Sequence, residues 1–558
     1  MNKDEFDAIV IGSGAGGGAC LWSLVNHGLN VCLLEAGPAY DFSKDYRLHL
    51  PEWETENFPK KIDTKNRQTF AKLQLLEPKW SELLSWNHQF GRFNSGTRRR
   101  PFAYHHVLGL GGTTLHFAGE AHRMNPQSMN MKTRFSVAAD WPVTYEELEP
   151  YYQQAETLVG VAGLNNDTVR WRSKPYPLPA HNFNYGSQRL KAGCESLGLN
   201  LTANSLAILS EPYDGRPGCN HCNNCVRGCP RSDKGSVDVT YIKKVQSKTN
   251  CTIKTEANVT HIEADKNDRV SAVYYQDSSG NEFRVKAKTI IIACGAVETP
   301  RLLLNSGNPS TNGGLANESG QLGQNFMETL SRNSSGIFSE PLGSHRGIPS
   351  DSICWDFNHP DAIEDVIGGC RFSSSVAETG LIGPIAYANR VVEGWGYEHK
   401  QKMRDTFGKV LTIGAIGESL PNRQSFIDLD ANEKDKFGQP KARINSYLGE
   451  MELKRLSFMM NTCRAIINAS GAEKIFEEYG SYDFFSATHV FGTCRMGNDP
   501  EDSVVNRYGQ SHRWKNLFIT DASVFPSSGG GEAPSLTIEA LAIRTADHIA
   551  DLLKKRII

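Results

Sequence analysis

A chain of 558 residues with 39% hydrophobic and 22% charged residues has the composition of a globular protein with a sizeable core. Its formal net charge of -2 excludes the basic excess typical of nucleic-acid-binding proteins, so we expect no nucleic-acid partner. No apolar run reaches the roughly 18 residues of a membrane-spanning helix, and no such helix is predicted.

The N-terminus lacks the features of a secretory signal peptide. Two acids, Asp4 and Glu5, stand where a basic segment is required, and the apolar run after them leads directly into glycines. We therefore expect either a cytoplasmic protein or a periplasmic one that is exported together with a signal-bearing partner.

The first 35 residues have the pattern of a dinucleotide-binding unit. Buried strands are predicted at 7–11 and 31–34, with a helix between them. A G-x-G-x-x-G motif opens that helix, and its glycines are Gly12, Gly14 and Gly17. They serve a tight turn, the approach of the pyrophosphate, and close packing of helix on strand, respectively. Glu35 is expected to accept hydrogen bonds from the ribose hydroxyls. The motif alone does not separate FAD from NAD.

Four further segments narrow the choice of dinucleotide. They lie at 106–119, 140–152, 289–303 and 489–537. Together with the N-terminal motif they resemble the glucose-methanol-choline (GMC) oxidoreductase family, in the family's order and over nearly the whole chain. The resemblance implies FAD as cofactor and the oxidation of an alcohol by hydride transfer to flavin N5.

The fold expected from this resemblance is α/β (α+β overall), with a Rossmann-like FAD-binding domain and a discontinuous substrate-binding domain that contains an antiparallel sheet. The FAD-binding domain is predicted at 1–325, with a lid-like segment at 46–100 and a cysteine insert at 216–232. The substrate-binding domain is predicted at 326–478, and 479–558 returns to the FAD-binding domain.

Several residues are expected to line the flavin. Gly111 and Gly112 would let the chain pass close to the isoalloxazine. A buried strand at 290–293 leads to Ala296, near the adenine end, and then to a helix opened by Thr299 and Pro300. Asp521 matches a family acid that lies near the ribityl chain.

His116 aligns with a histidine that, in some pyranose-oxidising relatives, bonds covalently to the flavin methyl group. The alternative is a noncovalent histidine in the pocket.

His489 matches the family's catalytic histidine. An imidazole suits the removal of the hydroxyl proton as the hydride leaves. The family places a second polar residue, His or Asn, where this chain has Ala533. We predict that Glu532, after three glycines, takes that role through a local backbone shift. The alternative is that Glu532 points to solvent.

Four cysteines follow the spacing C-x2-C-x2-C-x3-C-P, namely Cys219, Cys222, Cys225 and Cys229. This spacing is typical of bacterial ferredoxins and predicts an iron-sulfur cluster. The cluster is [4Fe-4S] if Cys229 is a ligand and [3Fe-4S] if it is not. Zinc and disulfides are the alternatives.

The sequence therefore predicts an FAD-dependent dehydrogenase that oxidises a secondary alcohol of a sugar or glycoside. The run 529–537 is similar to that of bacterial glucoside 3-dehydrogenases, which points to a pyranoside C3 hydroxyl. Electrons would leave through the cluster to a cytochrome or a quinone-linked acceptor, with a small subunit as partner. The alternatives are an oxygen-reducing alcohol or sterol oxidase, and an electron-transfer subunit with an inactive substrate site.

Overall fold

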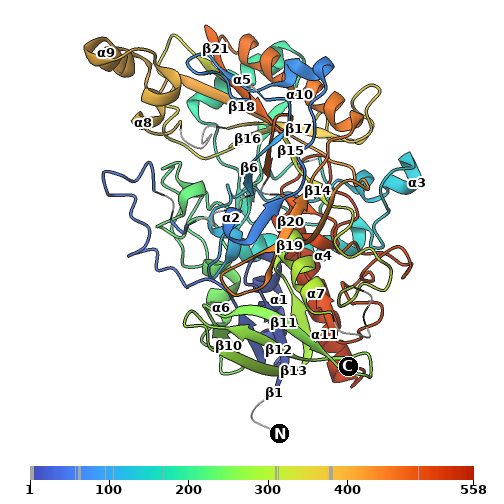
Figure 1. The fold of residues 1–558 in the computed structure, drawn as a ribbon. Helices are drawn as coiled ribbons and strands as arrows, with labels where there is room; N and C mark the ends of the chain where they lie inside the picture. Colours follow the sequence, from blue (N-terminus) through green and yellow to red (C-terminus); the bar gives the residue numbers. More distant parts are fainter. Residues whose placement is uncertain are drawn as a thin grey trace.

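Two large sheets organise the molecule, one at each end of the view in Figure 1. They are seen in a computed structural model that describes residues 5–56, 58–60, 64–94, 96–104, 106–167, 169–307, 311, 313–375, 381–487 and 489–558. The first sheet contains β1 (Glu5–Ile11), the first strand of the chain, and the last helix, α11 (Ser535–Lys554), lies beside it.

The first sheet has a parallel core with an antiparallel extension. Its order is β10-β2-β1-β13-β12-β11, and β24 also pairs with β13. The bounds are β2 (Val31–Leu34), β10 (Cys251–Lys254), β11 (Asn258–Ala264), β12 (Val270–Gln276), β13 (Glu282–Ile292) and β24 (Leu517–Ile519). Ile9 pairs with Cys32 on one side and Ile290 on the other. The central parallel strands have uninterrupted apolar runs because both faces of the sheet are buried, as in dinucleotide-binding folds. This confirms the predicted Rossmann-like unit.

The second sheet is antiparallel throughout, in the order β5-β4-β21-β15-β18-β17-β16-β9. The bounds are β4 (Trp86–Asn87), β5 (Gly91–Arg92), β9 (Leu201–Ala203), β15 (Leu330–Ile337), β16 (Ser352–Cys354), β17 (Cys370–Ser374), β18 (Val410–Gly417) and β21 (Lys474–Gly480). One face packs on α10 (Glu450–Ala469) and α5 (Tyr185–Ser196) around a second apolar core. This confirms the predicted antiparallel sheet.

Smaller elements connect the two sheets. The strands are β3 (Gln68–Phe70), β6 (Arg100–Tyr104), β7 (Ala162–Gly163), β8 (Leu178–Pro179), β14 (Met327–Glu328), β19 (Phe426–Lys434), β20 (Pro440–Asn445), β22 (Phe484–Ala487) and β23 (Val490–Phe491). The helices are α1 (Ala15–Asn26), α2 (Thr64–Arg67), α3 (Met131–Phe135), α4 (Tyr145–Val159), α6 (Lys243–Val245), α7 (Gly295–Asn305), α8 (Pro384–Ala386) and α9 (Gly396–Thr406). Within the described ranges, every helix is too short or too polar to cross a bilayer.

The segment 46–100 is more than the lid expected from the sequence. Its β3 pairs with β20, and its β4 pairs with β21 at the edge of the second sheet. Likewise β9, from a region assigned to the FAD-binding domain, pairs with β16. Strands of two or three residues carry no measurable alternation, which is why the sequence did not reveal them.

Helix α7 begins at Gly295, four residues before the predicted start, and Pro300 lies inside it. Proline has no backbone N–H, so the carbonyl of Ala296 loses its helical partner. That carbonyl instead accepts a hydrogen bond from Thr493 Oγ1 at 2.8 Å. The exchange ties the start of α7 to the C-terminal segment that contains His489.

Candidate active site

A cavity of about 540 Å³ is lined by residues from both large sheets. One end is formed by the glycine turn after β1 and by Glu35. The other end is formed by His489 and by strands of the second sheet. The volume lies within the ordinary range for small-molecule sites, and the lining joins a dinucleotide-binding turn to a second group of residues beyond it.

The glycine turn leaves room for a phosphate. A Cβ at Gly14 would meet no atom within 4 Å, whereas one at Gly17 would lie 1.9 Å from the carbonyl oxygen of Gly12. Gly112 packs directly against the turn, since a Cβ added at this position would lie 2.7 Å from the Cα of Gly14. Helix α1 starts at this open position, where its N–H groups favour an anion. The residues present therefore fit the pyrophosphate of FAD.

Glu35 stands at the end of β2 and lines the cavity. Its Oε2 accepts hydrogen bonds from the Ser13 N–H at 3.1 Å and the Ser13 hydroxyl at 2.6 Å, and its Oε1 accepts one from the Gly37 N–H at 2.8 Å. Burial raises the pKa of the carboxyl, and these bonds oppose the rise. The carboxylate is fixed where the ribose contact is predicted.

Asp521 and Ala296 line the cavity beside the glycine turn. Asp521 Oδ2 accepts hydrogen bonds from the Gly295 N–H at 2.9 Å and from Thr299 Oγ1 at 2.5 Å. Gly111 differs from the prediction, because it packs on Leu115 and Asp238 outside the cavity wall. Only Gly112 of that pair reaches the cavity.

His116 lines the cavity with both ring nitrogens facing carbonyl oxygens. Its Nδ1 lies 2.5 Å from the Val226 oxygen, and its Nε2 pairs with the Pro59 oxygen. The structure thus places His116 in the cavity wall beside the cysteine loop, and the covalent and noncovalent alternatives both stay predictions.

His489 faces the cavity from the residue before β23. Its backbone oxygen accepts hydrogen bonds from Thr329, through the N–H at 3.0 Å and the hydroxyl at 3.1 Å. Burial lowers the pKa of the imidazole to about 4, with the Glu120 carboxylate opposing the change and Arg371 and His122 adding to it. At neutral pH the ring is therefore uncharged and has a lone pair to offer.

The second sheet presents a polar wall to the cavity. Alternate residues of three neighbouring strands line it: Ser331 and Asn333 of β15, Gly414 and Ile416 of β18, and Arg371 and Ser373 of β17. Ser331 and Arg371 flank Ile416 in one row, and Asn333 and Ser373 flank Gly414 in the next. Only β17 carried a signal of this wall in the sequence, since Arg371 and Ser373 alternate with Cys370 and Phe372. In β15 the run 331–334 is polar at every position, so its wall residues could not be picked out.

A buried ion pair completes the wall. Arg371 Nη2 lies 2.5 Å from Glu120 Oε2, and both side chains line the cavity. Glu120 Oε1 accepts hydrogen bonds from the Ser350 hydroxyl at 2.7 Å and from Asn204 Nδ2 at 3.1 Å. Burial would raise the pKa of Glu120, but Arg371, His122 and Ser350 together hold it at about 2.

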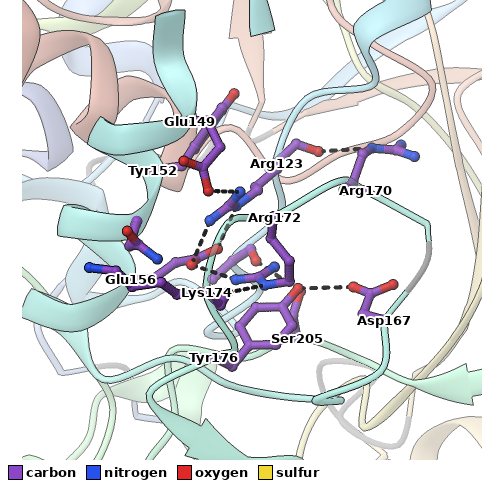
Figure 2. Close-up of polar contacts among 12 residues, drawn as sticks. Arg123, Glu149, Tyr152, Glu156, Asp167, Arg170, Arg172, Lys174, Tyr176 and Ser205 are labelled. Atoms are coloured by element: carbon purple, nitrogen blue, oxygen red, sulfur yellow. Dashed lines mark hydrogen bonds and ion pairs between the residues drawn. The ribbon is translucent and has the colours of Figure 1, made fainter. Parts of the chain in front are cut away.

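Glu532 does not join His489, contrary to the prediction. The carboxylate is 3% exposed, so it does not point to solvent, and it lies outside the cavity lining. Its Oε1 binds Arg170 Nη2 at 2.7 Å and Asn358 Nδ2 at 2.9 Å. Arg170 Nε in turn donates to the Arg123 oxygen at 3.4 Å, within the network drawn in Figure 2.

Gly529 and Gly531, before Glu532, both have positive φ angles, which glycine adopts without strain. The Glu532 carboxylate forms its ion pair with the Arg170 guanidinium.

Replacing Glu532 by Gln should destabilise the protein while sparing catalysis. The change leaves the Arg170 cation buried without its anion, which costs about 3–5 kcal/mol. We expect a lower melting temperature, with kcat of the FAD-loaded protein unchanged within a few-fold. The double variant Glu532→Gln/Arg170→Met should recover part of the stability. A hundredfold loss of kcat in the folded Gln variant would instead place the carboxylate at the reacting atoms.

The four clustered cysteines lie in one loop, and none of the thirteen cysteines, all of them within the described ranges, forms a disulfide. Burial raises the pKa of the Cys219 thiol to about 12 and that of Cys229 to about 11. Cys229 Sγ donates to Asp233 Oδ1 at 2.9 Å. Over the described residues, no three His, Cys, Asp or Glu side chains gather closely enough to hold a metal ion. The four thiols have the donor chemistry of an iron-sulfur ligand set, and their side chains are not gathered around one point in the described structure.

The loop nevertheless touches the cavity, because Val226 lines it next to His116. Buried Lys234 donates to the oxygens of Cys225, Leu115 and Phe117 at 2.8 Å, 3.0 Å and 3.1 Å. The cysteine loop is thus fixed against the segment that carries His116.

Comparisons with known proteins agree on one family. Two models described as GMC oxidoreductase match residues 101–330 and 421–542. The fructose dehydrogenase large subunit of Gluconobacter japonicus is 30% identical over 98% of this chain and 98% of its own. The gluconate 2-dehydrogenase flavoprotein of Pantoea cypripedii is 27% identical over 98% and 96%. Paromamine 6'-oxidase of Streptomyces fradiae is 28% identical over 99% and 92%.

A solved structure, pyridoxine 4-oxidase from Mesorbium loti, has a TM-score of 0.64 at 18% identity and covers 98% of this chain and 99% of its own. At that identity the likeness concerns the fold.

Proposed function

Because the chain belongs to the GMC oxidoreductase family, whose members bind FAD and act on alcohol and sugar CH–OH groups, we propose that it is a dehydrogenase of a secondary alcohol in a sugar or glycoside. One observation carries the proposal: an uncharged histidine, a wall of hydroxyl and amide groups, and a dinucleotide-binding turn share one cavity.

FAD supplies the hydride acceptor when it is bound. The residues of the chain accept the hydroxyl proton and orient the substrate. A ring nitrogen of His489 takes the hydroxyl proton as the carbon loses its hydride, which leaves a ketone. The charge that then develops on the imidazole is stabilised by the Glu120 carboxylate, which already favours the protonated form of His489. Thr329 holds the histidine backbone in place.

A sugar suits the polar wall. Ser331, Asn333 and Ser373 offer hydrogen bonds in two rows, as several neighbouring hydroxyls of one ring require. The fructose dehydrogenase large subunit named above is called after a neutral, polyhydroxylated sugar. For the carbon oxidised we propose C3 of a pyranoside, on the likeness of the run 529–537 to glucoside 3-dehydrogenases.

Anaerobic reduction of the flavin tests this function. Methyl glucoside and glucose, mixed with the purified holoprotein without oxygen, should bleach the flavin absorbance, and the product should be a keto-sugar. Bleaching by primary alcohols or sterols but by no sugar would overturn the sugar assignment. Rapid re-oxidation by air with peroxide release would identify an oxidase. A flavin that no alcohol bleaches would identify an electron-transfer subunit.

Electron export through an iron-sulfur cluster, to a cytochrome or quinone-linked acceptor with a small subunit, remains part of the proposal. The steps at His489 do not depend on it. We expect the purified protein to contain iron and acid-labile sulfide, and Cys222→Ser to lose both while keeping its flavin. Cys251→Ser, a scattered cysteine on β10, is the matched control. Zinc alone, or no metal, would contradict the cluster.

A further inference from the structure

The Glu120–Arg371 pair is the charged feature of the cavity at the His489 end. The other charged groups that line the cavity lie toward the dinucleotide: Glu35, the Arg67–Glu298 pair and Asp521. In the described part of the wall, the remaining polar groups are uncharged hydroxyls and amides. The substrate end therefore combines one anion and one cation, with no net charge.

The pair is built to stay ionised. The Arg371 side chain is 2% exposed and that of Glu120 is 10% exposed. Each is held by further bonds, since Arg371 Nε donates to the Gly531 oxygen at 3.0 Å and Nη1 to Ser373 Oγ at 2.5 Å. Three of the five guanidinium N–H groups are thereby used, while Arg371 still lines the cavity.

We propose that the Glu120–Arg371 pair determines specificity by admitting uncharged polyhydroxylated substrates and excluding both sugar acids and amino sugars. The inference rests on the proposed function and deepens it. A neutral sugar can donate to Glu120 and accept from Arg371 while the pair stays intact. A carboxylate or ammonium must lose its hydration and compete for a partner that is already taken, which is unfavourable in a closed site.

Two single variants separate the contributions. Glu120→Gln keeps the side-chain shape and leaves the Arg371 cation without its anion. Arg371→Met keeps the length and leaves the Glu120 carboxylate without its cation. The double variant removes both charges. Three probes that differ only at C6 report on each protein. They are methyl glucoside, its 6-carboxylate (the methyl glucuronide) and its 6-amino-6-deoxy derivative at a pH where the amine is protonated.

The readout is the rate and the apparent Kd of anaerobic flavin reduction. The unmodified protein should favour methyl glucoside over both charged probes by about tenfold or more. Glu120→Gln should raise the preference for the carboxylate, relative to methyl glucoside, by about tenfold or more and lower that for the amine. Arg371→Met should do the opposite, and the double variant should return toward the original ranking. The change in preference between the probes should lie mainly in the apparent Kd.

Opposite shifts from the two variants cannot arise from a merely structural role, which would weaken all three probes alike. Shifts in the same direction, or ratios unchanged within twofold while methyl glucoside still bleaches the flavin, would overturn the inference and leave the proposed function standing. If the variants fail to retain FAD, the unmodified protein decides, because equal rates with neutral and charged probes contradict the pair's role. Absence of bleaching with all three probes would overturn the proposed function and this inference together.

Discussion

Replacing His489 by Ala should lower kcat for flavin reduction by about 10²–10⁴-fold, the usual contribution of a general base. The flavin content should be unchanged, because the ring lies at the substrate end of the cavity and the dinucleotide is held by the glycine turn and Glu35. Stopped-flow reduction of the bound flavin measures the step directly. His548→Gln, a histidine on the outer part of α11, is the matched control and should keep full activity.

The pH profile of the unmodified protein gives an independent reading. The pKa of His489 is lowered to about 4, so the uncharged ring is present above that pH and is lost as the pH falls through it. We expect kcat/KM to be constant near neutrality and to decline at acidic pH, with no such decline in His489→Ala. A break near pH 7 that persists in the variant would assign the base to another group. Less than a tenfold loss in the Ala variant would contradict the role of His489.

Replacing Gly14 by Val should yield a folded but colourless protein. The side chain would enter open space at the start of α1, so the apoprotein has no clash to relieve. In the holoprotein the same space is expected to hold the pyrophosphate. Overpacking costs about 1–3 kcal/mol, and each 1.4 kcal/mol is tenfold in affinity, so we expect the affinity for FAD to fall by about 100-fold.

Titration of the apoprotein with FAD, followed by flavin fluorescence, measures this affinity. The same concentration of FAD should raise the melting temperature of the unmodified protein more than that of the variant, because stabilisation grows with the ratio of ligand concentration to Kd. Gly96→Val, in a loop between β5 and β6, is the control for the substitution itself. Normal flavin content in Gly14→Val would show that the dinucleotide does not approach this turn.

The dinucleotide end of the site could be predicted because its determinants are local in sequence. The turn, the helix and Glu35 occupy one continuous stretch, and each residue type has a backbone reason to be there. The substrate end could not be predicted in the same way. Glu120 and Arg371 are 251 positions apart and meet only because β17 takes its particular register beside β18.

Glu532 also shows that a contact between residues far apart in the sequence cannot be predicted from a local pattern. Its position next to Ala533 made it a reasonable candidate for the family's second polar residue. The ion pair with Arg170, 362 positions away, redirects the carboxylate into a buried network, and no local pattern contains that information. Motif position predicts where the backbone passes, whereas the direction of a charged side chain depends on the partner it finds.

The alternation along β17 has a consequence for how the enzyme can diversify. Phe372 stands between two residues of the cavity wall, yet it belongs to the opposite face and packs in the core with the residues of α10. Exchanging Ser331 or Asn333 therefore alters what the ring of a ligand meets without touching the apolar layer behind it, whereas Ser373 also holds Arg371. New specificities can accumulate one position at a time on a scaffold whose folding they do not disturb.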